Sequence, residues 1–175
     1  MKNWALCFLC TVTVLSAAAQ TAKIEWNTWE EAAAKMEKAP RKLMVDVYTD
    51  WCGWCKKMDA TTMVDQAVTQ LVNKHFYAVK LDGESKHDIV FKGRTYRFVA
   101  TGQRGYHELP AELMGGKMSY PTLVFLDEQY GIIQALPGYF DAPKLESILA
   151  YFGENAYKQT GWEPFAAGYK SLIAR

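Results

Sequence analysis

The 175-residue sequence predicts an α/β fold in which a central mixed β-sheet is flanked by helices. Near-continuous apolar strands at 42–48 and 76–81 are separated by helical periodicity, and this β-α-β order is the unit of a parallel strand pair. A third apolar strand at 121–126 is followed by a turn and a returning strand at 132–136, which adds an antiparallel hairpin. The sheet is therefore expected to contain both kinds of pairing.

The composition indicates one globular domain. Half of the residues are hydrophobic and 22% are charged, a balance that excludes an intrinsically disordered chain. The length is sufficient for a single buried core. Beyond the first nineteen residues, no apolar run is long enough to cross a membrane.

The N-terminal segment has the pattern of a secretory signal peptide. Lys2 precedes an apolar run at 4–15, and small residues follow up to Ala19. A positive start, a short apolar centre and a small-residue end favour export and cleavage after Ala19. An uncleaved membrane anchor is the alternative, although the apolar run is short for a span. We therefore expect a signal peptide at 1–19 and a mature domain at 20–175, with no stable membrane insertion after cleavage.

Cleavage changes the cysteine count and the charge. Cys7 and Cys10 leave with the segment, so the mature chain keeps Cys52 and Cys55. Lys2 also leaves, so 19 of the 20 basic residues remain against 19 acidic ones, and the formal net charge falls from +1 to zero. A nucleic-acid-binding protein needs a basic face, so no nucleic-acid partner is expected. Export exposes the two remaining thiols to oxidising conditions, in which they can pair.

The helices are predicted from capping residues and periodicity. Thr28 and Glu31 form a capping box that opens a helix ending before Pro40. A second helix runs from Gly53 towards Ala60. Further helices are expected from Asp65, at 106–113, at 143–152 and, after a second capping box at Thr160 and Glu163, from there to the C-terminus.

Two segments of the chain are longer than the predicted sheet and its flanking helices require. Residues 83–118 contain a tight hairpin at Phe91–Tyr96, with Gly93 supplying a positive φ, and a short helix that ends at a glycine pair. We interpret them as an insertion beside the cysteine pair. Residues 154–175 form a C-terminal helical extension whose aromatic residues suit packing rather than ligand binding.

The segment Asp50–Lys57, DWCGWCKK, places two cysteines three positions apart where an apolar strand passes into a helix. Such spacing suits half of a zinc site, a structural disulfide or a redox-active pair. Zinc needs four ligands, and His75, His87 and His107 show no ligand spacing, so no metal is expected. A bridge across four residues removes little unfolded-state entropy, which disfavours a structural disulfide. The redox interpretation is favoured.

A redox pair gives the two cysteines different tasks. The free amides and the positive end of the helix dipole stabilise a thiolate at Cys52. Cys52 is thus the expected nucleophile, and Cys55, one turn further on, resolves the mixed disulfide. Because the Cys52–Cys55 couple is itself the redox group, no cofactor is expected.

The stretch Val45–Lys56 resembles the active-site segment of the thioredoxin superfamily, and in particular exported thioredoxin-like proteins of Gram-negative bacteria. The resemblance covers about residues 24–153 and implies a thioredoxin-like fold. It also implies that Asp46 is the buried carboxylate that relays the proton of the resolving cysteine, and that Lys80 accompanies it. Gly138 falls on the glycine of the last β-turn region.

The resemblance further implies a substrate-binding surface around the cysteines. The Ser-Tyr-Pro-Thr sequence falls on the family's cis-proline loop, so Pro121 is expected to be cis and, with Tyr120, to position a substrate chain by strand addition. Trp51, Trp54 and Tyr120 would form an aromatic rim that contacts an apolar peptide segment, with Gly53 between the two tryptophans. The alternative role of Trp51 and Tyr120 is to pack the loops.

The residues alone allow two positions for Asp46. An ionised carboxylate in an apolar strand is costly unless it is partnered, and burial would raise its pKa, which suits a proton acceptor. The alternative is a solvated side chain at a sheet edge. Lys80, taken alone, is expected to be a partly exposed strand lysine with a minor electrostatic role.

Together these observations predict an exported, periplasmic thiol–disulfide oxidoreductase whose substrates are protein thiols and disulfides. The surroundings of Asp46 and Lys80 favour a reductase, which would need electrons from a membrane partner. Trp54, however, stands where thioredoxin has proline, and this dipeptide tunes the reduction potential, so an oxidase or isomerase stays open. The alternatives from other classes are a non-catalytic binding module for a protein partner and a copper or zinc carrier.

Overall fold

The computed structural model describes residues 23–173. The predicted signal peptide at 1–19 lies outside these residues, and so do Cys7 and Cys10. Within the described range, no helix combines the length and the apolar character that a membrane span requires.

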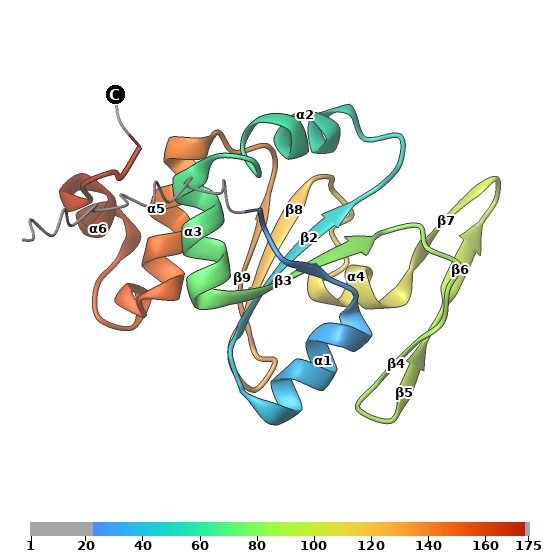
Figure 1. Ribbon diagram of the computed structural model, residues 1–175. Coiled ribbons are helices and arrows are strands. Elements are labelled where there is room, and N and C mark those ends of the chain that lie inside the picture. The colour runs from blue at the N-terminus through green and yellow to red at the C-terminus, as the bar shows by residue number, and fades with distance from the viewer. Residues whose placement is uncertain (1–22, 174–175) are drawn as a thin grey trace, which may run out of the picture.

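The centre of the molecule is a five-stranded sheet with the strand order β1-β3-β2-β8-β9 (Figure 1). Parallel pairing joins β3 to both β1 and β2, whereas β8 is antiparallel to β2 and to β9. The mixed sheet predicted from the sequence is therefore confirmed. Its strands are β1 (Trp26–Asn27), β2 (Lys42–Tyr48), β3 (Phe76–Asp82), β8 (Thr122–Leu126) and β9 (Ile132–Pro137).

Helices cover both faces of the sheet (Figure 1). One face packs against α1 (Trp29–Lys38) and α4 (Glu108–Leu113), and the other against α3 (Gln66–His75) and α5 (Ala142–Gly153). The helix that follows β2, α2 (Gly53–Thr61), belongs to the α3–α5 side, because its Met58 lies in the core on that side. Two apolar cores thus lie on opposite faces of one sheet.

The alternation along β2 decides which side chains face α2. Leu43, Val45 and Val47 lie in the core on the α1–α4 side, whereas Met44 lies in the core on the other side. Successive side chains of a strand point to opposite faces, so Asp46 shares the face of Met44 and α2. Asp46 has no exposed surface, and the alternative of a solvated side chain at the sheet edge is wrong.

The two predicted capping boxes have different outcomes. At the start of α1, Thr28 Oγ1 accepts the Glu31 N–H and the Glu31 carboxylate accepts the Thr28 N–H, so this capping box is confirmed. The second is wrong, because Gly161 is the N-cap of α6 (Trp162–Gly168) and makes no side-chain cap bond. The carbonyl of Thr160 instead accepts the Tyr151 hydroxyl at 2.8 Å.

The C-terminal extension is only partly helical, which corrects the prediction of a helix to the terminus. It consists of a 3-10 turn, η1 (Ala156–Lys158), and α6, which ends at Gly168. Residues 169–173 then contact α5 at one residue, where Tyr169, Ser171 and Leu172 all donate hydrogen bonds to the Glu146 carboxylate. These three donors explain why the chain leaves the helix.

The segment 83–118 forms two hairpins and α4. The hairpin expected around Gly93 is present as β4 (Ile89–Phe91) and β5 (Arg94–Tyr96), with a φ of 77° at Gly93. A second hairpin, β6 (Phe98–Thr101) with β7 (Arg104–His107), was not predicted from the sequence.

His107 explains where the following helix begins. The prediction started this helix at Tyr106, but His107 ends β7 and caps α4, which begins at Glu108. The buried ring bridges two backbone groups, because Nδ1 accepts the Leu109 N–H at 3.2 Å and Nε2 lies 3.0 Å from the His87 carbonyl. This ring ties the two hairpins to the helix.

Candidate active site

The cysteine pair lies at the start of α2, just after the end of β2. Cys52 is the N-cap of α2, and its Sγ accepts the Cys55 N–H at 3.1 Å. The two sulfurs form a disulfide. The first cysteine therefore occupies the helix start at which free amides and the helix dipole favour negative charge.

The disulfide is buried while its aromatic neighbours are exposed. Cys52 and Cys55 are 4% and 3% exposed, whereas Trp51 and Trp54 are 56% and 57% exposed. Gly53 separates the two tryptophans, and a Cβ at this glycine would meet no atom within 4 Å. The sequence thus places two large apolar rings in solvent beside a covered disulfide, an arrangement typical of a contact surface.

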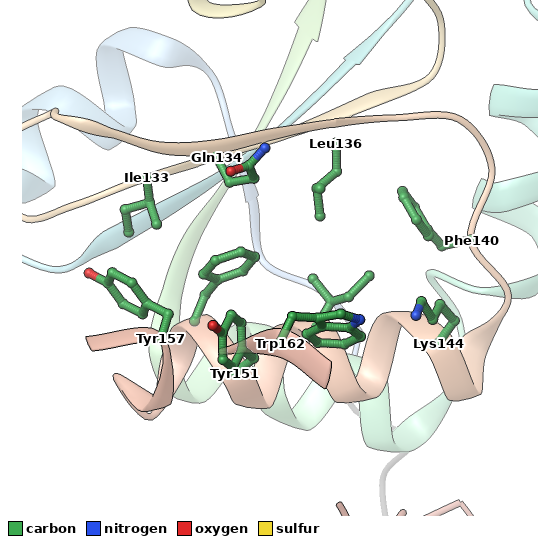
Figure 2. Close-up of a pocket in the computed structure, with 10 residues that line it drawn as sticks. Ile133, Gln134, Leu136, Phe140, Lys144, Tyr151, Tyr157 and Trp162 are labelled. Carbon is green, nitrogen blue, oxygen red and sulfur yellow. The ribbon is translucent and has the colours of Figure 1, made fainter. Parts of the chain in front are cut away.

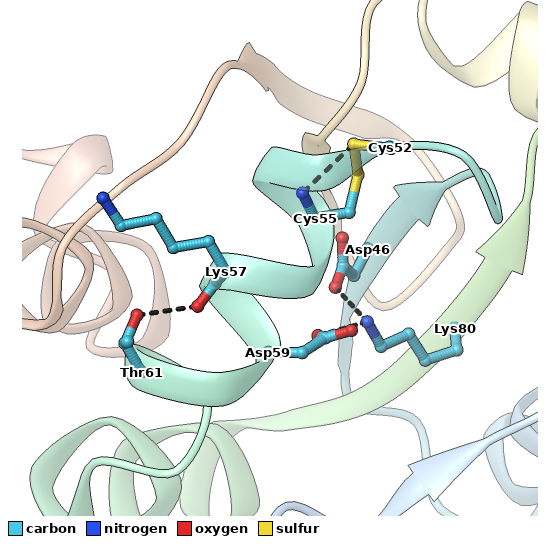
Figure 3. A network of polar contacts seen from close by, with 7 residues as sticks. All are labelled: Asp46, Cys52, Cys55, Lys57, Asp59, Thr61 and Lys80. Carbon is cyan, nitrogen blue, oxygen red and sulfur yellow. Dashed lines mark hydrogen bonds and ion pairs between the residues drawn. A yellow bond between two sulfur atoms is a disulfide. The ribbon is translucent and has the colours of Figure 1, made fainter.

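Asp46 lies beneath the disulfide and is paired with Lys80 (Figure 3). The two residues are register partners in the parallel strands β2 and β3, and Lys80 Nζ donates to Asp46 Oδ2 at 2.8 Å. Burial raises the pKa of Asp46, while the ammonium of Lys80 acts in the opposite direction.

The other oxygen of Asp46, Oδ1, is buried and has no hydrogen-bond partner. Figure 3 shows that this carboxylate has one oxygen towards Lys80 and the other on the side of Cys55. A buried oxygen without a donor is costly, because it has lost its hydration without replacement. It would be satisfied by a proton delivered from the direction of Cys55.

Asp59 is the third member of this network of charged side chains, and it was not predicted from the sequence. Lys80 Nζ also lies 2.5 Å from Asp59 Oδ1, so one ammonium bridges two carboxylates. Burial lowers the pKa of Lys80, but its two acidic partners outweigh this and raise it. The available signal was spacing, because Asp59 stands four residues after Cys55 and therefore shares its face of α2.

Lys80 also connects the buried acid to solvent. Its side chain is 23% exposed, which fits the expected partial exposure, but it contacts two carboxylates and the rings of Trp26 and Tyr48, at 5.0 and 5.1 Å. A cavity of about 460 Å³ adjoins this lysine, and Asp59 and Trp26 also line it. Asp46 itself does not reach the cavity lining, so Lys80 and Asp59 stand between it and the open space.

The proline loop precedes β8 and lies beside the two tryptophans that flank the cysteine pair. The Tyr120–Pro121 peptide bond is cis, the isomer that the resemblance implied. The Gly138 N–H donates to the Pro121 carbonyl at 2.8 Å, and Gly138 has a φ of 102°, which suits glycine. Trp54, Tyr120, Pro121, Gly138 and Tyr139 together line a largely apolar groove of about 260 Å³. The structure thus brings Trp54 and the proline loop to one surface.

Trp51 is held by residues of the segment 83–118. Its ring packs edge-on against Tyr120 at 5.8 Å between centroids, and its Nε1 donates to Glu84 Oε2 at 3.0 Å. The guanidinium of Arg104, at the tip of the second hairpin, lies 5.5 Å from the Trp51 ring. Burial, with Glu84 and then Asp82, raises the pKa of Tyr120 to about 12, so its hydroxyl stays neutral. Glu84 and Arg104 were not predicted, because they lie more than thirty residues after Trp51 and no local pattern links them to it.

No metal-binding group is present in the part of the chain that the structure describes. Between residues 23 and 173, no cluster of three or more His, Cys, Asp or Glu side chains could hold a metal ion. The prediction that the couple needs no cofactor stays a prediction.

A family model described as "Thioredox_DsbH: Protein of unknown function, DUF255" matches residues 12–144, which is most of the chain. Among curated proteins, the "Uncharacterized protein B0495.5" of Caenorhabditis elegans is 25% identical over 84 residues, which cover 47% of this chain and 12% of that protein. The human "Spermatogenesis-associated protein 20" is 27% identical over 67 residues, 38% of this chain and 8% of that protein. The chain therefore spans a small part of these relatives.

Two solved structures share the fold. One, titled "Solution Structure of a putative disulphide-isomerase from Bacteroides thetaiotaomicron", is 26% identical with a TM-score of 0.55, over 82% of this chain and 100% of that chain. The other, titled "DsbH Oxidoreductase", is 16% identical with a TM-score of 0.52, over 89% of this chain and 96% of that chain. The predicted thioredoxin-like fold is therefore confirmed.

Proposed function

Because the chain belongs to the Thioredox_DsbH family, we propose that it is a thiol–disulfide oxidoreductase that acts on protein disulfides through the Cys52–Cys55 couple. One observation carries the proposal. The cysteine that caps α2 is covalently paired with the next cysteine, and a buried carboxylate with a free oxygen lies on the side of Cys55. The solved relative whose title names a putative disulphide-isomerase supports the same class of reaction.

Reduction of a substrate begins from the dithiol form. The Cys52 thiolate attacks one sulfur of the substrate disulfide; a Cys52–substrate disulfide forms, the substrate S–S bond breaks, and one substrate thiolate leaves. Cys55 then gives its proton to Asp46 Oδ1, and its sulfur attacks Cys52. The second substrate thiolate leaves, and the Cys52–Cys55 disulfide is restored. Two electrons have passed from the cysteine pair to the substrate.

The buried acid makes the second step favourable. Asp46 must be ionised to accept the proton of Cys55, and Lys80 keeps a compensating charge at its other oxygen. After the transfer, Lys80 and Asp59 offer a route to the adjoining cavity. A base held in contact with the proton it accepts typically contributes about 10²- to 10⁴-fold to a rate.

The substrate is an extended segment beside the disulfide. The apolar groove between Trp54 and Pro121 accommodates an apolar side chain of such a segment. Trp51, fixed by Glu84 and Tyr120, bounds the other side of the cysteines. Rim residues that are held in place lose little conformational entropy when a substrate binds.

The proposal also includes the direction of electron flow and the cellular location of the protein. We place the chain in the periplasm, exported by residues 1–19, as a reductase that receives electrons from a membrane partner. The base beneath Cys55 favours release of reduced substrate, which is the step a reductase repeats. Trp54 before the second cysteine is the feature that favours an oxidase or isomerase instead.

The test is a redox titration combined with a turnover assay. The Cys52–Cys55 couple is equilibrated with glutathione buffers, and insulin reduction is measured for the wild type, Cys52→Ser and Cys55→Ser. We expect a measurable potential, turnover by the wild type, none with Cys52→Ser, and a trapped mixed disulfide with Cys55→Ser. A couple that cannot be reduced, or a wild type no faster than Cys52→Ser, overturns the proposal.

One observation favours a second candidate, a non-catalytic binding module. Cys52 is only 4% exposed while the aromatic rim is open, so the surface could hold a protein partner without exchange. Retention of a bound protein partner separates the two functions, because a binding module keeps its partner when Cys52 and Cys55 are both replaced by serine. An oxidoreductase loses its covalent intermediate.

A further inference from the structure

A second pocket lies far from the cysteines along the chain, between the edge strand β9, α5 and the C-terminal extension (Figure 2). Its volume is about 400 Å³, which is within the range of about 300–1,000 Å³ that small-molecule sites occupy. Part of its wall, in η1 and α6, lies beyond residue 144, where the family match ends. The pocket is thus partly built by a segment outside that match.

The lining is apolar along most of its length. Ile133 and Leu136 project from β9, and Ile148 and Phe152 from α5. The part of α5 that lines the pocket runs from residue 144 to residue 152, which corresponds to about 12 Å at the rise of an α-helix. The shape therefore suits an extended hydrocarbon chain rather than a compact polar molecule.

The far wall is held in place before any ligand binds. Trp162 packs edge-on against Tyr151 at 5.3 Å between centroids, and the Tyr151 hydroxyl donates to the Thr160 carbonyl at 2.8 Å. Phe165 packs on the same tyrosine at 5.0 Å. Because these contacts fix α6 against α5, the pocket needs little ordering when it is filled.

One end of the pocket carries its single charge. Among the lining residues only Lys144 is ionised, and Figure 2 shows it beside Trp162 and Phe140. Its Nζ lies 4.4 Å from the centroid of the Trp162 ring, and between residues 23 and 173 it makes no ion pair. An exposed ammonium at the mouth of an apolar channel complements an anion that carries an apolar tail.

We propose that this pocket binds a free medium-chain fatty carboxylate, with its tail along α5 between Ile133 and Phe152 and its head group at Lys144. The site is independent of the redox reaction, because none of its lining residues belongs to the cysteine site. A ligand there would fasten the C-terminal extension to the edge of the sheet.

Calorimetric titration of the whole protein with decanoate, octanoate and decanol, each below its micellar concentration, tests the site. Each buried methylene strengthens binding about fourfold, so octanoate should bind roughly fifteenfold more weakly than decanoate. Lys144→Met should weaken decanoate about fivefold, the range of an exposed ion pair, and leave decanol unchanged. Lys158→Met is the matched control, because it removes the same charge from neighbouring η1 outside the lining.

A second variant keeps the test decisive. Ile133→Trp fills the pocket from a half-buried position on the edge strand and should abolish binding of both decanoate and decanol, with unfolding and insulin reduction as checks of the fold. The proposal is overturned if folded wild type binds no decanoate, if the chain-length dependence is absent, or if Lys144→Met and Lys158→Met act alike. Association with phosphatidylglycerol vesicles without binding of free decanoate would identify a membrane-contact face and also overturn it.

Discussion

Asp46 and Glu146 are both carboxylates without exposed surface, but their surroundings differ in kind. Glu146 accepts hydrogen bonds from Tyr169, Ser171 and Leu172, and all three donors come from the C-terminal segment. Asp46 has a lysine at one oxygen and no partner at the other. A fully satisfied buried acid holds a chain segment in place, whereas an acid with one free oxygen keeps the capacity to take up a proton.

The largest expected effect is on the rate of disulfide reduction, which should depend on Asp46 and not on Glu146. Asp46→Asn keeps the shape of the side chain but cannot accept the proton of Cys55, so the rate of insulin reduction should fall about 10²- to 10⁴-fold. Glu146→Gln should leave this rate within a factor of two. Equal losses in both variants would mean that the free oxygen has no special role.

Stability should distinguish the two acids in the opposite sense, with the larger loss at Glu146. Glu146→Ala leaves three donors without their acceptor, and we expect the free energy of unfolding to fall by about 2–3 kcal/mol. Urea denaturation of the oxidised protein measures the change, and amide exchange at Leu172 reports whether the C-terminal segment detaches. Glu163→Gln on α6 is the control. An unchanged midpoint for Glu146→Ala would show that the segment is not held by this acid.

The partners of Asp46 should move its titration in opposite directions. Lys80 lowers the pKa of Asp46 and Asp59 raises it, so Lys80→Met should shift that pKa upward and Asp59→Asn should shift it downward. The carboxyl carbon resonance of Asp46, followed by NMR against pH in the oxidised protein, measures this without interference from thiols. Of the other groups nearby, Cys55 is held in the disulfide in this state, and the ring of Tyr48 lies 5.1 Å from Lys80 Nζ. Shifts of the same sign would contradict the bridging role of Lys80.

The smallest effect concerns stability against pH. Burial raises the pKa of Asp46, so the folded protein keeps this proton at pH values where the unfolded chain has released it. Stability attributable to Asp46 is therefore lost as the pH rises from the ordinary value of 3.8 through the raised pKa of the folded state. Asp46→Asn should remove this dependence and raise the free energy of unfolding at pH 8 by about 1–2 kcal/mol. Denaturation of the oxidised protein at pH 4 and pH 8 provides the comparison, and a variant less stable at pH 8 contradicts it.

The sequence predicts most of the sheet because its signals are local. An apolar run marks β2, and an acid inside that run can only be buried once the strand is covered on both faces. The Thr28 capping box is confirmed because nothing else competes for its atoms. At Thr160 the same pattern fails, because the carbonyl of that residue bonds to Tyr151, nine positions earlier, and the helix starts one residue later.

The candidate site was only partly predictable because two of its contacts are long-range. Asp59 reaches Lys80 only through the packing of α2 on the sheet, and Glu84 reaches Trp51 only because the segment that follows β3 comes back beside the start of α2. Asp59 has only the weak signal of its position four residues after Cys55 in α2, and no periodicity or spacing marks the contact between Glu84 and Trp51 in the sequence. A resemblance recognised from the residues around the cysteines does not supply the contacts that a distant segment such as 83–118 makes with them.

The placement of the segment 83–118 suggests how such a protein can diversify. The segment leaves the sheet where β3 ends beside Tyr48 and returns where β8 begins beside Val47, so both junctions lie at the same end of β2 as the cysteines. A Cβ at Gly83, the first residue after β3, would come within 2.3 Å of the Tyr120 hydroxyl, which fixes that junction closely. Between these anchors lies one segment that forms the two hairpins and α4 and adds no strand to the central sheet. Evolution or a designer could replace it to alter the choice of client, while the strands that hold the chemistry stay untouched.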